Sequence, residues 1–284
     1  MSTIQRPWRE TDFDSLLPRR SLWLIAAFRR YVYWYLLRHF TAIRLDRRGF
    51  LPEALKALQP SDICLSTSCE RLPDGPVVVV LNHPSWWDPL ICLVLSDLFP
   101  NRVHYAPIDS ASLEQYRFFG KLGFFGVQPR SVPGARVFLR TGQAILNQPR
   151  SMLWVTPQGR FVDVRDRPIR IEAGLGHLLA RCPHAVVLPL ALELTFWEQR
   201  LPEALARFGE PIRCDIPMSP QDWTRRIETE LERNLDELAE AARSRNPEAF
   251  LILLEGRQGV SFFYDLWRKA RSRIVGLFGS SRQP

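Results

Sequence analysis

One histidine and one aspartate stand at a spacing that suits acid–base chemistry. His83 is followed five positions later by Asp88, an H-x4-D pattern. Pro84 and Ser85 favour a bend between them, so we expect the carboxylate to fold back onto the imidazole ring. A carboxylate on one ring nitrogen fixes the tautomer and raises the basicity of the other, as in a catalytic triad without its serine. This pattern predicts a general base for a hydroxyl that the substrate supplies. The same spacing also fits a histidine and a capping aspartate that merely meet at a turn.

The residues before His83 are typical of a buried strand. Four consecutive valines and a leucine, Val77–Leu81, follow the turn-forming segment Pro73-Asp74-Gly75-Pro76. A short β-branched run bounded by turn residues predicts a strand that is buried on both faces. This strand would deliver His83 to a strand end, where α/β sheets place their binding sites.

The segment Asn82-His83-x-Ser85-x-x-Asp88 resembles the first motif of the glycerolipid acyltransferases, the family of lysophosphatidic acid and related lysophospholipid acyltransferases. This resemblance implies that His83 is the general base for acyl transfer from a thioester to a lipid hydroxyl and that Asp88 orients it. It also places Asn82 and Ser85 among the substrate-binding residues. The fold that it implies is glycerol-3-phosphate acyltransferase-like.

A second segment, residues 123–130, resembles the second motif of the family, in which an arginine after an apolar strand holds the phosphate of the acceptor. Guanidinium groups bind phosphate in a bidentate manner, so the residue type of Arg130 suits this role. Arg130 comes about one residue later than the family's usual spacing and follows Pro129. An arginine at a strand end can also be merely solvated.

The third block resembles the family motif Pro-Glu-Gly-Thr-Arg with two departures. An apolar run breaks at Pro157-Gln158-Gly159-Arg160, so Gln158 stands in place of the glutamate. Glutamine keeps the hydrogen-bonding shape of glutamate but lacks its charge. The arginine comes one position early, which leaves Phe161 at the usual arginine position. The resemblance implies that residues 157–160 bind substrate, whereas the departures put lysophosphatidic acid as the acceptor in doubt.

The last block is the apolar segment Ala185–Leu192, which contains Pro189. It resembles the fourth motif of the family, which is associated with binding of the acyl chain or the acyl donor. The four blocks follow one another in the expected order from Asn82 to Leu192.

The composition is that of a globular protein with an anionic partner. The chain has 284 residues, of which 46% are hydrophobic and 24% charged, enough for one sizeable α/β domain. Five cysteines without a C-x-x-C pair indicate reduced thiols in a cytosolic compartment, with neither a disulfide framework nor a zinc site. The net charge of +8 suits a bilayer surface, an acidic cofactor such as coenzyme A, or nucleic acid. The N-terminus has no signal-peptide layout.

An aromatic-rich segment near the N-terminus, residues 21–40, predicts a helix. Arg29, Arg30 and Arg38 interrupt it, so it is not the uncharged stretch of about 20 residues that a spanning helix needs. Tryptophan and tyrosine at headgroup depth with snorkelling arginines are typical of a helix that lies in the membrane interface. The alternative is a helix packed on the core of the domain itself.

Strands and helices alternate along the rest of the chain. Further strands are expected at 102–106, near 124–130, at 152–156 and at 185–192, and helices at 86–98, 112–121, 133–147, 173–180, 219–242 and 261–275. This alternation predicts an α/β fold with a mostly parallel twisted sheet flanked by helices.

The expected organisation has two parts. Residues 1–60 would form an N-terminal arm and a membrane-interfacial helix, and 61–284 an acyltransferase α/β domain with C-terminal covering helices and a motif core at 77–195. Residues 41–76 are expected to be a connector with a short helix near 52–58.

The function that these features predict is that of a membrane-associated O-acyltransferase on the cytoplasmic face of the membrane, peripheral or monotopic. The acyl donor would be acyl-CoA or acyl carrier protein, the acceptor a lysophospholipid or another lipid hydroxyl, and no metal or bound cofactor is implied. One alternative is a non-phospholipid acceptor, a glycosylated lipid or an aminolipid. The other is a non-catalytic basic membrane-binding protein. Nucleic-acid binding is not expected, because the aromatic residues are concentrated in helices rather than on an exposed stacking platform.

Overall fold

A computed structural model describes residues 16–56 and 72–256 of the chain. Its strands are β1 (Ala42–Asp46), β2 (Val77–Leu81), β3 (Val103–Asp109), β4 (Phe124–Val127), β5 (Ser151–Val155), β6 (Val186–Thr195), β7 (Glu203–Phe208), β8 (Ile212–Arg213) and β9 (Phe250–Glu255). Its α-helices are α2 (Leu22–His39), α3 (Glu53–Lys56), α4 (Asp88–Ser96), α5 (Ser110–Gln115), α6 (Val132–Leu146), α7 (Gly174–Leu179) and α8 (Pro220–Ser244). Two 3₁₀ segments, η2 (Arg117–Leu122) and η3 (Pro247–Ala249), complete the described elements.

The described strands form one mixed sheet in the order β4-β3-β5-β2-β6-β7-β1-β9, with β8 paired to β6. Neighbours from β4 to β6 are all parallel, as are β7 and β1. The antiparallel pairs are β6–β7, β6–β8 and β1–β9. The predicted fold class, a mostly parallel sheet flanked by helices, is therefore confirmed.

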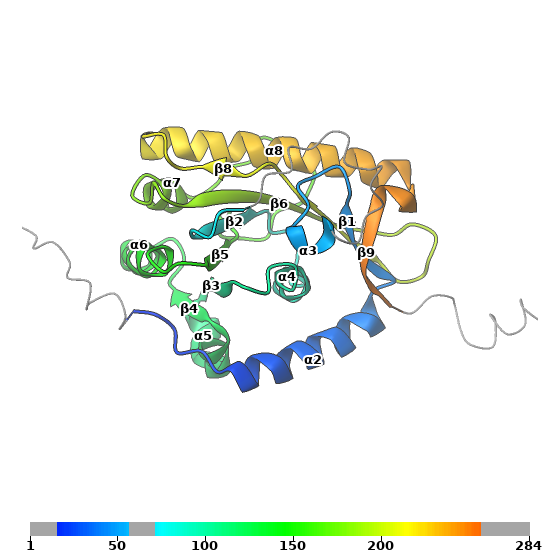
Figure 1. Cartoon of the computed structure of the whole chain (residues 1–284), viewed down its shortest axis with the longest axis horizontal. Coiled ribbons are helices and arrows are strands. Elements are labelled where there is room, and N and C mark those ends of the chain that lie inside the picture. Colours follow the sequence, from blue (N-terminus) through cyan, green and yellow to red (C-terminus); the bar gives the residue numbers. More distant parts are fainter. Residues whose placement is uncertain (1–15, 57–71, 257–284) are drawn as a thin grey trace, which may run out of the picture.

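Two hydrophobic cores cover the two faces of this sheet. Val78 and Val80 point into a core that includes α6, α7 and α8, whereas Val77 and Val79 point into one that includes α2 and α4. In Figure 1, α8 runs along the top of the molecule and α2 along the bottom, with the sheet between them. The valine strand is buried throughout, as its composition predicts, because helices cover both faces.

The segment expected to be a connector contains a strand of the sheet. β1 pairs with β7 and β9, although its sequence Ala-Ile-Arg-Leu-Asp carries two charges. Arg44 is neutralised by a buried ion pair with Glu203 of β7, a residue 159 positions away. The boundary expected near residue 60 is therefore wrong, because the first part of the chain supplies a strand to the same sheet. The short helix expected near 52–58 is present as α3.

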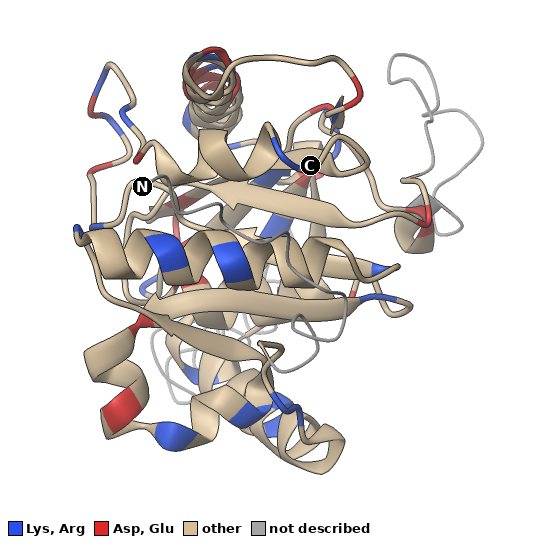
Figure 2. Cartoon of the chain, turned by 90° about the vertical axis from the view of Figure 1, so that its left-hand side faces the viewer, with Lys and Arg blue, Asp and Glu red and all other residues tan. Residues whose placement is uncertain are grey.

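Other differences lie in the C-terminal half and at the β4 edge. The strands β7 and β9 have no counterpart among the predicted elements. The helix expected at 112–121 is divided at Tyr116 into α5 and η2. The helices expected at 133–147, 173–180 and 219–242 form as α6, α7 and α8, and Figure 2 shows α6 across the middle with two Lys/Arg bands. The helix expected at 261–275 and most of the arm at 1–20 lie outside the described residues.

The aromatic N-terminal helix has one buried side and one exposed side. Val32 and Leu36 of α2 are fully buried in the core that α4 shares. Trp23, Tyr31 and Trp34 are about half exposed or more, with fractions of 77%, 51% and 48%. In the part of the chain that the structure covers, no helix combines the length and the apolar character needed to cross a bilayer.

Candidate active site

The imidazole of His83 and the carboxylate of Asp88 are in contact. His83 lies two residues beyond the end of β2, and Asp88 is the first residue of α4. His83 Nδ1 and Asp88 Oδ2 are 2.7 Å apart, and Asp88 is buried whereas the His83 side chain keeps 20% of its surface exposed. A carboxylate accepts hydrogen bonds, so the tautomer of the neutral imidazole that fits this contact has its proton on Nδ1 and a free lone pair on Nε2. The bend expected at Pro84 and Ser85 therefore brings the pair together.

Ser85 orients the carboxylate. Its backbone N–H donates to Asp88 Oδ2 at 3.2 Å and its hydroxyl donates to Oδ1 at 3.2 Å. The same hydroxyl accepts the backbone N–H of Trp87 at 3.0 Å. The Ser85 side chain, expected among the substrate-binding residues, is thus engaged in the turn that fixes Asp88. Asp88 in turn has both oxygens occupied, which holds it in one orientation.

Asn82 has a structural position rather than an exposed one. It is 2% exposed, and its side-chain amide bonds to both backbone groups of Leu192 on β6. The motif led us to expect that Asn82 contacts the substrate directly. The Asn82 amide does not fit this role, because it is buried and both its donor and its acceptor are occupied. Asn82 instead ties the end of β2 to β6, and this fixes where His83 leaves the sheet.

The third block lies directly beside the first, because β5 is the parallel neighbour of β2. Gln158 is 8% exposed, and its Oε1 accepts the backbone N–H of His83 at 3.0 Å. The backbone N–H of Val162 donates to the carbonyl of His83 at 3.0 Å. Gly159 has a φ of +62°, a left-handed conformation that favours glycine at this turn. Both backbone groups of His83 are therefore held by the 157–162 segment, in which Pro157 is also buried.

Phe161 packs against the catalytic candidate. Its ring centroid lies 4.4 Å from that of the His83 imidazole, and the side chain is 58% exposed. The sequence placed this residue at the position of the family's arginine but did not predict the ring contact. Arg160 beside it is exposed and forms no ion pair with a described residue. An aromatic surface therefore borders the imidazole where the third motif predicts a cation.

Residues 64–193 match the model of the protein family described as Acyltransferase. The matched stretch contains the His83–Asp88 pair, Arg130 and the 157–160 turn, and it ends within β6. Residues 64–193 therefore form an acyltransferase domain. The resemblance that the four motifs indicated is thus confirmed, and the protein is an acyltransferase enzyme. Among solved structures, the 1-acyl-sn-glycerophosphate (LPA) acyltransferase PlsC from Thermotoga maritima is similar at 15% identity, covering 83% of this chain and 84% of that chain with a TM-score of 0.45. None of the curated proteins matches the sequence.

Arg130 lies further from the His83–Asp88 pair of this acyltransferase than Gln158 and Phe161 do. It follows β4, is exposed and has a φ of +49°. β4 and β2 are separated by β3 and β5, and neighbouring strands are about 4.8 Å apart, so the two strands lie about 14 Å from each other. The structure therefore does not bring Arg130 into contact with His83. A bound acceptor would have to span this distance to use both residues.

The helix α2 contacts the first motif of the acyltransferase through aromatic rings. The ring of Trp87, next to Asp88, lies 5.6 Å from that of Tyr35, 5.5 Å from that of His39 and 4.9 Å from that of Phe40. Trp86 contacts Trp87 edge-on at 5.5 Å and is itself 63% exposed. Nothing in the motif signalled these contacts, because they join segments about 50 residues apart. The N-terminal helix thus braces the turn that holds the catalytic candidates.

Proposed function

We propose that this acyltransferase moves a fatty acyl group from a thioester, acyl-CoA or acyl carrier protein, to a hydroxyl of a lysophospholipid-type lipid. The observation that carries the proposal is the 2.7 Å contact between His83 Nδ1 and the buried Asp88 carboxylate, which leaves Nε2 available as a base. Chemistry of this kind needs a positioned base near the acceptor hydroxyl and contributes about 10²–10⁴-fold to the rate.

The reaction would proceed in two proton-coupled steps. His83 Nε2 takes the proton of the acceptor hydroxyl while the oxygen attacks the thioester carbonyl, forming a C–O bond and a tetrahedral oxyanion. Asp88 stabilises the imidazolium that results. The oxyanion then collapses, the C–S bond breaks, and the imidazolium returns its proton to the leaving thiolate. Backbone donors of the Gly159 turn or the Arg160 guanidinium would stabilise the oxyanion.

The polar head of the acceptor would be held by Arg130 and Arg160. Both side chains are exposed and form no ion pair with a described residue, so their charges are available to an anion. A second candidate acceptor is a neutral lipid such as a glycosylated one, which the exposed ring of Phe161 beside His83 favours. Aromatic faces pack against the apolar side of a ring and offer no charge to a phosphate.

Membrane association would rest on the exposed side of α2. Exposed tryptophan and tyrosine rings lie on this side together with Arg30 and Arg38, and the guanidinium of Arg38 lies 4.0 Å from the ring centre of Trp34. Such a side suits the headgroup region of an anionic bilayer, and the cytoplasmic leaflet carries such lipids. That neither a metal nor a bound cofactor takes part stays a prediction.

The experiment that tests the proposed reaction is thiol release from acyl-CoA by the purified full-length protein, with and without a membrane lipid extract. Lipid-dependent release with acylated products in mass spectrometry supports the proposal. Absence of acylated product with both acyl-CoA and acyl carrier protein contradicts it.

Sedimentation with anionic vesicles tests the membrane contact separately. Trp23→Glu/Trp34→Glu should leave the protein in the supernatant, whereas the wild type pellets. Val137→Glu, an exposed apolar position on α6, serves as the control. Equal sedimentation of all three proteins would exclude α2 as the membrane contact.

A further inference from the structure

A pocket of about 380 Å³ lies at the β4 edge of the sheet, outside the candidate active site. Its walls come from the segment 16–19, from α5 and η2, and from β4 itself. β4 begins the strand order, with β3 and β5 between it and the strand that leads to His83. The proposed acyl transfer assigns no role to this pocket.

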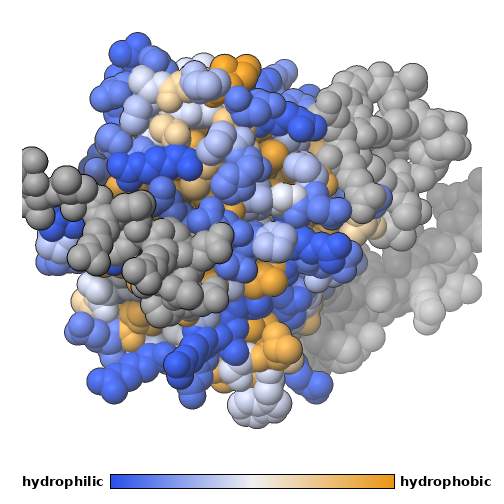
Figure 3. Space-filling model, turned by 60° about the vertical axis from the view of Figure 1, so that its left-hand side comes forward, coloured by the Kyte–Doolittle hydropathy of each residue, from blue (hydrophilic) through white to orange (hydrophobic). Residues whose placement is uncertain are grey.

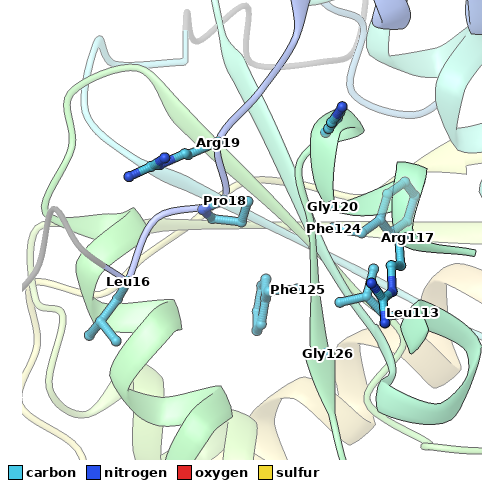
Figure 4. A pocket seen from close by; sticks show the side chains of 10 residues that line it. Leu16, Pro18, Arg19, Leu113, Arg117, Gly120, Phe124, Phe125 and Gly126 are labelled. Atoms are coloured by element: carbon cyan, nitrogen blue, oxygen red, sulfur yellow. The ribbon is translucent and has the colours of Figure 1, made fainter.

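The lining of the pocket combines apolar surface with positive charge. Leu113, Phe124 and Phe125 supply hydrophobic surface, and the three charged residues of the lining, Arg19, Arg117 and Lys121, are all cations. Figure 4 shows Arg19 and Arg117 on opposite sides of the view, with Pro18 and Phe125 between them. A pocket of this kind matches a ligand with an anionic head and an apolar part.

Within residues 16–56 and 72–256, none of the three cations forms an ion pair with an acidic side chain. Like charges around an apolar wall repel one another, and the low-dielectric wall weakens the screening by water. A phosphate between them would relieve this repulsion, and arginine and lysine are the residues that bind phosphate.

The walls are fixed to the rest of the fold. The backbone N–H of Ser21 donates to the carbonyl of Lys121 at 2.8 Å, which joins the start of α2 to η2. Phe28 of α2 contacts Phe118 and Phe119 of η2, with ring centroids 5.8 and 6.1 Å apart. The η2 wall of the pocket is therefore anchored to the aromatic helix α2.

Two exposed aromatic residues, Tyr116 and Phe118, flank Arg117 of the pocket lining in the sequence. Tyr116 and Phe118 are 47% and 38% exposed, and Trp23 lies two residues beyond Ser21. Figure 3 shows apolar and strongly hydrophilic side chains side by side at the lower end of the molecule. A free phosphate would leave this apolar surface in water, whereas a phospholipid would cover it.

We propose that this pocket binds one anionic phospholipid, with its phosphate among Arg19, Arg117 and Lys121 and the first part of an acyl chain against Leu113 and Phe124. The site is separate from His83, so binding there does not depend on the acyl-transfer proposal. The phospholipid is bound as a ligand and not as the acceptor.

Titration calorimetry of the full-length protein with monomeric dihexanoyl phosphatidylglycerol tests this site. Arg117→Gln/Lys121→Gln removes two charges, and Gly120→Leu fills the pocket without changing any charge. A Cβ at Gly120 would meet only the Leu113 side chain, at 3.9 Å, so the backbone tolerates the added group. Arg136→Gln/Arg181→Gln removes two exposed charges elsewhere and is the matched control.

Both pocket variants should weaken binding of the lipid about ten-fold or more, whereas the control variant should bind as the wild type does. Dihexanoyl phosphatidylcholine, which has no net charge, should bind more weakly than the phosphatidylglycerol. Equal lipid affinity in Gly120→Leu and wild type would overturn the assignment. Inorganic phosphate or coenzyme A that binds as tightly as the lipid and is lost in both pocket variants would also overturn it, because the site would then not be a lipid site.

Discussion

Asn82 at the end of β2 and Leu192 on β6 are joined by two hydrogen bonds of 2.8 Å. The Asn82 Nδ2 group donates to the Leu192 carbonyl, and the Leu192 N–H donates to Asn82 Oδ1. Both residues are almost fully buried. These two hydrogen bonds fix the position at which the chain leaves β2 toward His83. Asn82, the first residue of the motif, therefore has a structural role rather than a role in substrate contact.

Replacing Asn82 by alanine should therefore act on stability first. Both backbone groups of Leu192 would lose their partner in a buried position, at a cost of about 1–3 kcal/mol each. Urea unfolding of Asn82→Ala should show a reduced free energy of unfolding, with Asn101→Ala, an exposed position, as the control. Unchanged stability together with a raised KM for the acceptor would instead restore the substrate-binding interpretation.

The sequence predicted the centre of the sheet and the contact between His83 and Asp88, because both depend on local patterns. Val77–Leu81 is a continuous apolar run, and the bend after His83 is set by its own residues. β1 was missed because the charge of Arg44 is neutralised by Glu203, which no local window includes. β7 was missed because Glu-Ala-Leu-Ala-Arg-Phe has the propensity of a helix, and its place between β1 and β6 overrides that propensity.

In the candidate site too, contacts between segments distant in the sequence were not predicted. The third motif placed Gln158 among the substrate-binding residues, but it did not predict that the Gln158 side chain accepts the His83 backbone N–H. The contact of Phe161 with His83 and the contacts of Trp87 with α2 depend on how distant segments pack. Such contacts carry no signal in a single sequence.

His104 on β3 should make the fold sensitive to acid. The indole N–H of Trp154 donates to His104 Nδ1 at 3.1 Å, so this nitrogen is unprotonated in the folded protein. Burial, and then the nearby positive charge of Arg20, lower the pKa of His104 to about 3. In the unfolded chain a histidine has a pKa of about 6.5. Below this pH the unfolded chain therefore binds a proton at His104, whereas the folded chain does not until the pH approaches about 3.

The free energy of unfolding should consequently fall as the pH drops from about 6.5 toward about 3, by up to about 1.4 kcal/mol per pH unit from this residue. Urea unfolding of the wild type and of His104→Gln between these pH values measures the contribution. The variant should show a shallower decline. Parallel curves for the two proteins would mean that His104 titrates equally in both states.

Arg160→Ala should distinguish the two acceptor classes. If its guanidinium holds an anionic head, the KM for lysophosphatidic acid should rise about ten-fold or more while the donor KM stays nearly constant. If the guanidinium faces the thioester oxygen, kcat should fall and both KM values should change little. Arg165→Ala, an exposed residue paired to Asp163, is the control. If neither Arg160→Ala nor Arg130→Ala changes any constant, the acceptor is the neutral lipid that Phe161 favours.

The acyl-transfer rate of His83→Ala tests the central claim most directly. Wild type, His83→Ala, Asp88→Asn and His177→Ala, a histidine on α7, are compared by thiol release and by acylated lipid product. Circular dichroism confirms that each variant is folded. Loss of the base should lower kcat by about 10²-fold or more, Asp88→Asn should also lower it severely, and His177→Ala should leave it unchanged. Wild-type turnover in a folded His83→Ala variant would contradict the account.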